Sequence, residues 1–116
     1  MNQHSIYALC EPGTLTVRYV GQTELPLKYR MAAHIKKAST AFRPFPVEKW
    51  IADLVSSGKK PDCILLTTCP ASLVREVEKN WILLFIDNGY DMLNVRDCNN
   101  RGKRTCYPSP DQRRYS

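Results

Sequence analysis

Hydrophobic and polar positions alternate in two short segments near the start of the chain, 5–9 and 17–22. Both segments are rich in residues that favour β-strands, and the turn-forming residues of 11–14 lie between them. The alternation therefore predicts a β-hairpin.

The register of this hairpin decides which side chains are neighbours across it. If the loop comprises only 12–14, Leu9 lies opposite Val17 and Tyr7 lies opposite Tyr19. The two tyrosine rings are then cross-strand neighbours. A slip of one residue would put the rings on opposite faces of the sheet.

Apolar residues recur at helical spacing in three later segments. The segment 26–38 begins with a proline, 47–57 is followed by Gly58, and 71–88 is followed by Gly89. Proline in the first turn and glycine after the last turn are typical helix boundaries. We therefore expect three helices.

A nearly unbroken apolar run at 62–68 separates the second and third helices. Such a run is typical of a central strand that is covered on both faces. A short extended segment is expected at 92–95. Together these elements predict an α+β fold, in which a small, mostly antiparallel three-stranded sheet is flanked by three helices in the order β-β-α-α-β-α.

Composition excludes several classes of protein. The chain has 116 residues, of which 43% are apolar and 24% charged, so neither a disordered nor a membrane protein is indicated. No membrane span or secretory signal is recognisable, and the five cysteines show no C-x2-C zinc pattern. We expect one cytoplasmic domain at 1–96 with reduced thiols.

The net charge is +6, and the segment after Asn94 carries six basic and two acidic residues, or +4 of that charge. A basic, polar segment of this kind favours an anionic partner and suits a flexible tail at 97–116 that lies along a phosphate backbone. A merely solvated tail is the alternative. The candidate contacts with nucleic acid are Lys36, Arg101, Lys103 and Arg104.

A carboxylate interrupts the apolar stripe of the third helix. At about 100° per residue, Val74, Trp81 and Phe85 share one face, and Glu78 falls within it, whereas Glu76 points outward. An inward carboxylate must be paired, protonated or bound to a cation. Glu78 is therefore a candidate functional residue.

Two basic side chains of the first helix lie beside its apolar stripe. Arg30 and His34 are four residues apart, so they share a face at the rim of the core. A purely structural alternative is an internal salt bridge between Arg30 and Glu78, with His34 bound to a backbone carbonyl.

These residues fit an order of motifs found in a known family. The chain resembles the GIY-YIG nucleases over about 5–94, and five motifs carry the resemblance: SIYAL, RYVGQT, Arg30-x3-His34, Glu78-x2-Trp81-Ile82 and Leu93-Asn94. The chain departs from the family pattern in having Ser5 for glycine and Val20 for isoleucine. It also lacks the further histidine that some members carry after the first helix.

The resemblance implies hydrolysis of a DNA phosphodiester with one divalent cation, Mg2+ or Mn2+ in its place. Glu78 would hold this ion, because hard cations accept a single carboxylate together with several waters. Arg30 would neutralise charge on the scissile phosphate, which a guanidinium can contact through two oxygens.

The remaining site residues follow from the same resemblance. Tyr7 is the first candidate for activating the nucleophile, and Tyr19 would orient the phosphate or share that role. His34 would pass a proton or bind Tyr19 or the phosphate, and Asn94 would hold the chain against the sheet as a scaffold. Gly21 would allow a close approach of backbone at the strand end.

Two other functions remain open from the sequence. The first is a catalytically inactive DNA-binding module of the same fold, and the second is a structural or protein-binding domain with an acidic partner. The chain shows no separate module for reading DNA sequence, so a protein partner could supply targeting. DNA preference, biological role and oligomeric state are not encoded in any motif found.

Overall fold

The computed structural model describes residues 3–98 and 103–106, and for 95–98 and 103–106 the backbone alone. The predicted α+β class and the order β-β-α-α-β-α are confirmed. The main elements are β1 (Gln3–Cys10), β2 (Val17–Thr23), α1 (Leu27–Thr40), α2 (Pro46–Ser56), β3 (Asp62–Pro70) and α3 (Val74–Asp87).

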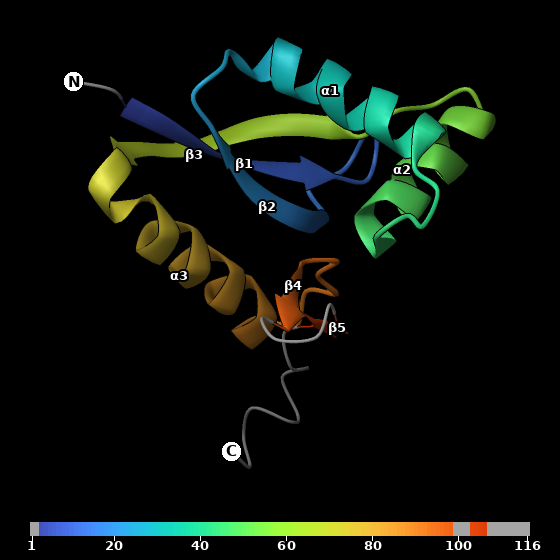
Figure 1. Ribbon diagram of the computed structural model, residues 1–116. Helices are drawn as coiled ribbons and strands as arrows, with labels where there is room; N and C mark the ends of the chain where they lie inside the picture. The colour runs from blue at the N-terminus through green and yellow to red at the C-terminus, as the bar shows by residue number, and fades with distance from the viewer. Residues whose placement is uncertain (1–2, 99–102, 107–116) are drawn as a thin grey trace.

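The three-stranded sheet is antiparallel throughout, in the order β2-β1-β3. Helices α1 and α2 cover one face of the sheet, and α3 covers the other (Figure 1). Side chains of β1 alternate between these layers, because successive residues of a strand point to opposite faces. Tyr7 and Leu9 pack with α1 and α2, whereas Ile6 and Ala8 pack with α3.

The prediction that the apolar strand near 62–68 is central was wrong. The central strand is β1, in which Ile6 to Cys10 are all fully buried, and β3 is an edge strand. Both faces of this small sheet are covered by helices, so even an edge strand needs apolar residues on two sides. Ile64 packs on the α3 side and Cys63 on the other.

The predicted hairpin register was also wrong, by two residues. Tyr7 pairs with Gly21, and Tyr19 pairs with Leu9. The loop is longer than three residues: the Glu11 backbone N–H donates to the Thr16 carbonyl at 3.0 Å, and a bulge follows Leu9. Because a shift of two preserves the side-chain alternation, the two tyrosines still share a face.

The end of the chain differs from the expectation of one extended segment at 92–95. Only Val95 lies in a strand, at the start of β4 (Val95–Cys98), which pairs with β5 (Lys103–Cys106). The rest of the predicted tail, at 99–102 and 107–116, lies outside the described residues, as does Arg101. The flexible tail stays a prediction.

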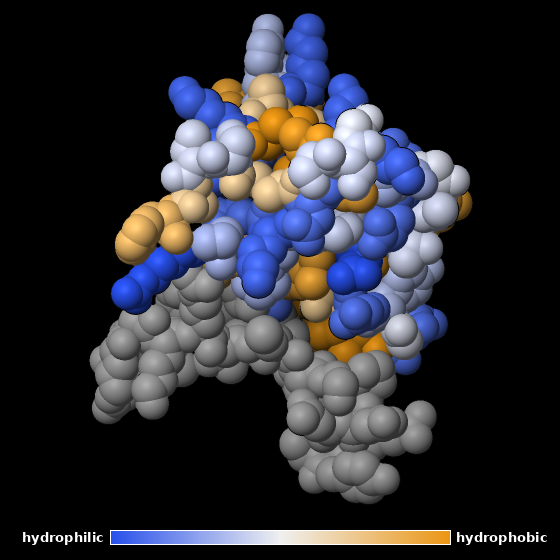
Figure 2. Space-filling view, turned by 90° about the vertical axis from the view of Figure 1, so that its right-hand side faces the viewer, coloured by the Kyte–Doolittle hydropathy of each residue, from blue (hydrophilic) through white to orange (hydrophobic). Residues whose placement is uncertain are grey.

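The surface shown in Figure 2 carries mostly hydrophilic side chains, with hydrophobic ones in small groups between them. The most exposed large apolar residues, Phe42 and Leu15, lie in loops. Isolated apolar side chains of this kind are ordinary on protein surfaces. No helix in the described part of the chain combines the length and the apolar character that a membrane span needs.

Candidate active site

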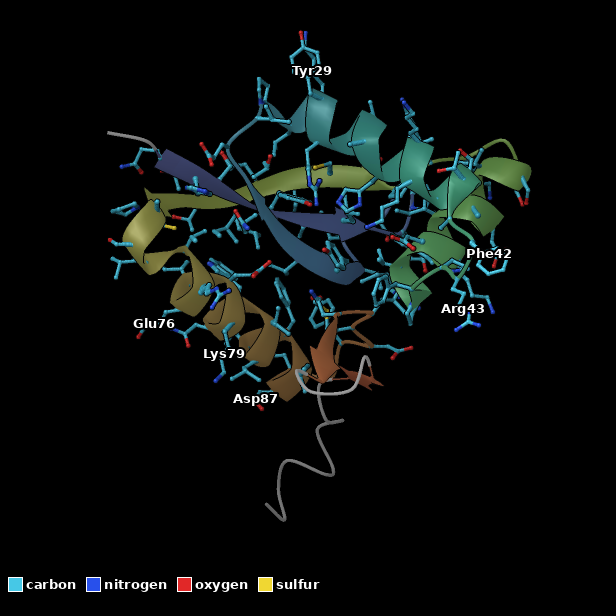
Figure 3. The ribbon with its side chains drawn as sticks, viewed as in Figure 1. Tyr29, Phe42, Arg43, Glu76, Lys79 and Asp87 are labelled. Carbon is cyan, nitrogen blue, oxygen red and sulfur yellow. The ribbon has the colours of Figure 1, made fainter. Side chains whose placement is uncertain are left out.

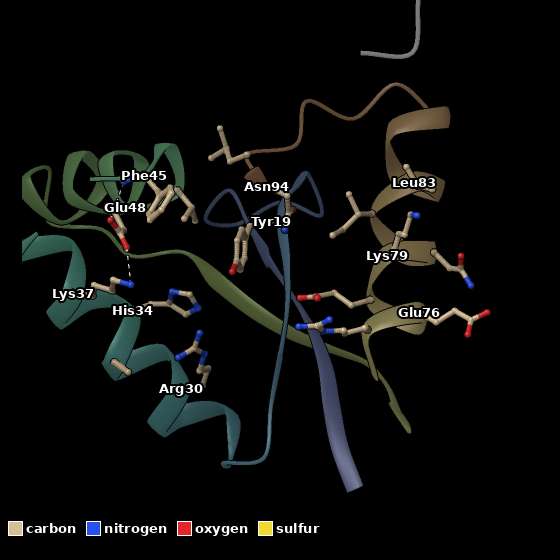
Figure 4. A pocket seen from close by; sticks show the side chains of 17 residues that line it. Tyr19, Arg30, His34, Lys37, Phe45, Glu48, Glu76, Lys79, Leu83 and Asn94 are labelled. Carbon is tan, nitrogen blue, oxygen red and sulfur yellow. Dashed lines mark hydrogen bonds and ion pairs between the residues drawn. The ribbon is translucent and has the colours of Figure 1, made fainter. Parts of the chain in front are cut away.

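A pocket of about 1000 Å³ lies beside the edge strand β2, between α1 and α3 (Figure 4). Helix α2 and the segment that follows α3 complete its wall. Five of the six residues that the sequence assigned to catalysis line this pocket: Tyr19, Arg30, His34, Glu78 and Asn94. They come from elements far apart in the sequence, so the fold brings the predicted constellation together.

The sixth residue, Tyr7, lies behind the pocket wall. Its side chain is fully buried and does not line the cavity. The Tyr7 hydroxyl accepts a hydrogen bond from Arg30 Nε at 3.0 Å and lies 2.6 Å from His34 Nε2. Since its lone pair receives the Arg30 proton, the hydroxyl can donate its own proton to His34. Tyr7 thus links two pocket residues that lie one helical turn apart on α1.

His34 is held in its neutral form. Burial, assisted by the positive charges of Arg30 and Lys37, lowers the pKa of His34 to about 4. With Nε2 accepting from Tyr7, the remaining proton belongs on Nδ1. The structural alternative for His34 was wrong in its partner, because a tyrosine hydroxyl and not a backbone carbonyl binds the ring.

This neutral histidine predicts a specific loss of stability in acid. In the unfolded chain His34 takes up a proton near pH 6.5, but the folded protein resists protonation down to about pH 4. The stabilisation is complete above pH 6.5 and disappears as the pH falls toward 4. Between pH 7 and pH 5 this group should lower the free energy of unfolding by about 2 kcal/mol.

Urea unfolding of the wild type and of His34→Gln at the two pH values measures this contribution. The other ionisable groups are common to both proteins, so their contributions cancel in the comparison. The wild type should lose about 2 kcal/mol more than the variant on acidification. An equal loss in both proteins would show that His34 is not held neutral.

Arg30 presents the outer part of its guanidinium to the pocket. Its Nε is used by Tyr7, and within the described residues neither Nη atom makes an ion pair with a carboxylate. The bond to Tyr7 restricts the plane of the group, so the edge formed by the two Nη groups remains for an anionic ligand. The salt bridge between Arg30 and Glu78, which was the structural alternative, is absent from the described part of the chain.

Glu78 is a half-buried carboxylate in the pocket wall, on the same face of α3 as the buried Ile82 and Ile86. Burial raises the pKa of Glu78 above its ordinary value, and the positive charges of Arg30 and Arg75 oppose this rise. Burial therefore disfavours the ionised carboxylate, and no ion pair in the described chain offsets this cost.

Glu76 lies two residues before Glu78 but has a different environment. Its side chain is exposed and projects from the outer side of α3 (Figure 3). It borders the same pocket, yet its carboxylate points away from the cavity (Figure 4). The predicted difference between the two glutamates agrees with these positions, because helical phase separates them by about 200°.

Tyr19 is the tyrosine that reaches the cavity. It lines the pocket, and its ring lies edge-on to His34, with the ring centroids 5.5 Å apart. Burial raises the pKa of the Tyr19 phenol, and the negative charge of Glu78 raises it further. The phenol is therefore a neutral hydrogen-bond donor close to the carboxylate.

Gly21 makes room for both phenols. A Cβ atom at this position would lie 2.5 Å from Tyr7 Oη and 2.9 Å from Tyr19 Cε2. The expected close approach is thus made by two tyrosine side chains, and not by backbone. No side chain other than hydrogen fits there without displacing them.

Asn94 binds the outer edge of β2. Its Oδ1 accepts from the Val20 backbone N–H at 3.1 Å, and its Nδ2 donates to the Val20 carbonyl at 2.8 Å. The adjacent Leu93 N–H donates to the Arg18 carbonyl at 2.6 Å. Asn94 is buried and lies against the sheet beside the pocket, which is the scaffold position expected for it.

Several charged residues of the pocket wall were not predicted from the sequence. Glu48 is buried, accepts from the Phe45 backbone N–H at 2.9 Å and lies 3.5 Å from Lys37 Nζ. Its position three residues after Phe45, at the start of a helix, is the acidic half of a capping pattern that could have revealed it. Arg75 and Lys79 also line the pocket.

None of the residues predicted to contact nucleic acid is seen to line the pocket in the described part of the chain. Lys36 is exposed but does not line the pocket, whereas its neighbour Lys37 does. For Lys103 and Arg104 only the backbone of β5 is described. Their predicted contacts with nucleic acid stay predictions.

A hard divalent cation fits the donors of this pocket. Glu78 offers an oxygen ligand without a competing ion pair in the described chain, and the cavity has room for water ligands. The described residues contain no group of three or more His, Cys, Asp and Glu side chains suited to a metal. Glu78 would therefore share such an ion with water and substrate oxygens.

Comparisons of the chain with protein-family models, with curated proteins and with solved structures find no match.

Proposed function

We propose that this protein is a metal-dependent DNA endonuclease that hydrolyses phosphodiester bonds, the activity that the GIY-YIG resemblance implies. One observation carries the proposal: a carboxylate without an ion pair in the described chain and a guanidinium fixed by a buried tyrosine line the same cavity. A carboxylate suits a metal ion, and a guanidinium suits a phosphate.

Glu78 would hold Mg2+, or Mn2+ in its place. A divalent ion bound there supplies Lewis-acid stabilisation of a phosphate oxygen. Its positive charge also relieves the cost of a half-buried carboxylate, which burial otherwise makes harder to ionise.

Arg30 would bind the phosphate that is cleaved. Arg30 lines the cavity, and negative charge on the phosphate oxygens grows as the bond to the attacking water forms. Because Tyr7 already fixes Nε at 3.0 Å, little reorganisation is needed when the phosphate binds.

The positions of the two phenols favour roles for Tyr7 and Tyr19 that differ from those that the resemblance implies. Tyr7 has no exposed surface, so contact with a nucleophilic water falls to Tyr19, which lines the cavity. Tyr19 would orient this water or the phosphate as a hydrogen-bond donor. Tyr7 would act through Arg30 and His34 as a positioning residue.

Two phenylalanine substitutions separate these roles. Tyr19→Phe should lower cleavage roughly 10- to 100-fold with little change in stability, because its hydroxyl faces the cavity. Tyr7→Phe should lower cleavage and also destabilise the fold by about 1–2 kcal/mol, since Arg30 Nε and His34 Nε2 both lose a buried partner. Single-turnover cleavage and urea unfolding measure the two effects. If Tyr7→Phe were as stable as the wild type, the hydrogen bonds of the buried Tyr7 hydroxyl to Arg30 and His34 would be contradicted.

The proposal is tested by incubating the purified protein with supercoiled plasmid and Mg2+, with and without chelator. Nicked or linear DNA that forms only with the metal supports the nuclease. A panel of linear, flapped and branched DNA, with mapping of the cut ends, then defines the substrate. DNA that is retained at low salt but never cut would favour the inactive binding module. Absence of both binding and cleavage would favour the protein-binding alternative.

A further inference from the structure

Helix α1 presents a row of three side chains to the pocket, of which the first and last are positively charged and the middle one is the neutral His34. Arg30, His34 and Lys37 all line the cavity, at spacings of four and three residues that keep them on one face. The row is about 10 Å long from Arg30 to Lys37, at 1.5 Å per residue. Because a single phosphate at Arg30 does not span this length, the far end of the row is left for another group.

Lys37 is held at that far end by a buried carboxylate. The side chain of Glu48 is 6% exposed and that of Lys37 is 66% exposed, and Lys37 Nζ lies 3.5 Å from Glu48 Oε2. Glu48 is itself fixed, because its other oxygen accepts from the Phe45 backbone N–H at the start of α2. Figure 4 shows Lys37 directed toward Glu48, with Phe45 next to it.

The ammonium end of this ion pair is largely exposed, although its carboxylate partner is buried. The Lys37 ammonium has three donors, and among the described residues its one carboxylate partner is Glu48 Oε2, so donors remain that are open to water. Its neighbour Lys36 is exposed as well, but it points away from the row because one residue turns the helix by about 100°. The two lysines therefore have the same side-chain chemistry but differ in direction and in the ion pair that Lys37 makes with Glu48.

We propose that Lys37 binds a second phosphate of the substrate strand, a neighbour of the phosphate at Arg30, so that the strand lies along the pocket face of α1. The assignment of the first phosphate to Arg30 rests on the proposed nuclease function. Glu48 already keeps the ammonium at the pocket wall. Lys37 therefore loses less conformational freedom when the phosphate binds.

The matched pair Lys37→Met and Lys36→Met tests this inference. The affinity for a short fluorescein-labelled DNA duplex is measured by anisotropy in EDTA, over a series of salt concentrations, so that no cleavage occurs. Loss of one phosphate contact should lower the slope of log affinity against log salt by about 0.9 in Lys37→Met. Lys36→Met should leave the slope near that of the wild type, and Lys37→Arg should retain it.

The outcomes separate this inference from the proposed function. A slope change confined to Lys37→Met supports the second phosphate site, even if the wild type cuts no DNA with Mg2+. Equal slopes for Lys37→Met and the wild type would overturn the inference, even in a protein that cleaves plasmid. A change confined to Lys36→Met would overturn it in favour of the outward lysine. No binding of DNA by the wild type would overturn both proposals.

Discussion

Replacement of Glu78 by glutamine is expected to lower Mg2+-dependent DNA cleavage by at least about 100-fold, because a neutral amide is a poor ligand for a hard cation. The protein should remain folded. Burial raises the pKa of the Glu78 carboxyl, so its negative charge opposes folding at neutral pH. Glu78→Gln should therefore unfold at a slightly higher urea concentration than the wild type at pH 7.

This gain in stability should shrink as the pH falls. The folded protein protonates Glu78 more readily than the unfolded chain, so acid removes the penalty from the wild type. Glu76→Gln is the matched control, since Glu76 belongs to the same helix but is exposed. It should retain nearly full cleavage. If Glu76→Gln lost activity and Glu78→Gln kept it, the assignment of the metal ligand would be wrong.

Substitution of Gly21 by alanine is expected to destabilise the fold by about 2 kcal/mol and to abolish most cleavage. The added methyl group would lie 2.5 Å from Tyr7 Oη and 2.7 Å from Tyr7 Cζ. Tyr7 is fully buried and cannot move aside without breaking its bonds to Arg30 and His34. The substitution thus disturbs the pocket indirectly, because Tyr7 holds the pocket residues Arg30 and His34 in place. Urea unfolding measures the loss of stability.

The same substitution made in a Tyr7→Leu variant identifies the cause of this loss of stability. In Tyr7→Leu the ring and its hydroxyl are gone, so Gly21→Ala should cost less there than in the wild type. Some cost should remain, because Tyr19 Cε2 also lies 2.9 Å from the added methyl group. Equal costs in the two backgrounds would show that contact with Tyr7 is not responsible.

The local patterns of the sequence were sufficient to predict the order and class of the elements. Alternation over 5–9 and 17–22, followed by helical periodicity, predicted the strands and helices with ends displaced by a few residues. The inward direction of Glu78 was also predictable, because helical phase is a local property. Neither conclusion required knowledge of which elements pack together.

The arrangement of the strands could not be predicted in the same way. The Glu11 to Thr16 loop conformation sets the hairpin register, and several loop lengths were compatible with its residues. The apolar run of Ile6 to Cys10 is as typical of a central strand as that of β3, so composition alone did not rank them.

The depth of each site residue depended on packing between elements. Tyr7 and Tyr19 share a face of the sheet, yet only Tyr19 reaches the cavity, because α1 covers Tyr7 through Arg30 and His34. Likewise Lys37 lines the pocket and the neighbouring Lys36 does not. One position on a helix turns a side chain by about 100°, so the sequence alone did not distinguish the two lysines.

The side chain of Asn94 makes the hydrogen bonds that a neighbouring strand would make with the outer edge of β2 at Val20. Its amide satisfies both backbone groups of Val20, so a strand from a second molecule cannot add at that register. A full neighbouring strand would satisfy the same backbone groups with many more residues. The single amide of Asn94 meets this need with one side chain, beside the part of the pocket that Tyr19 lines.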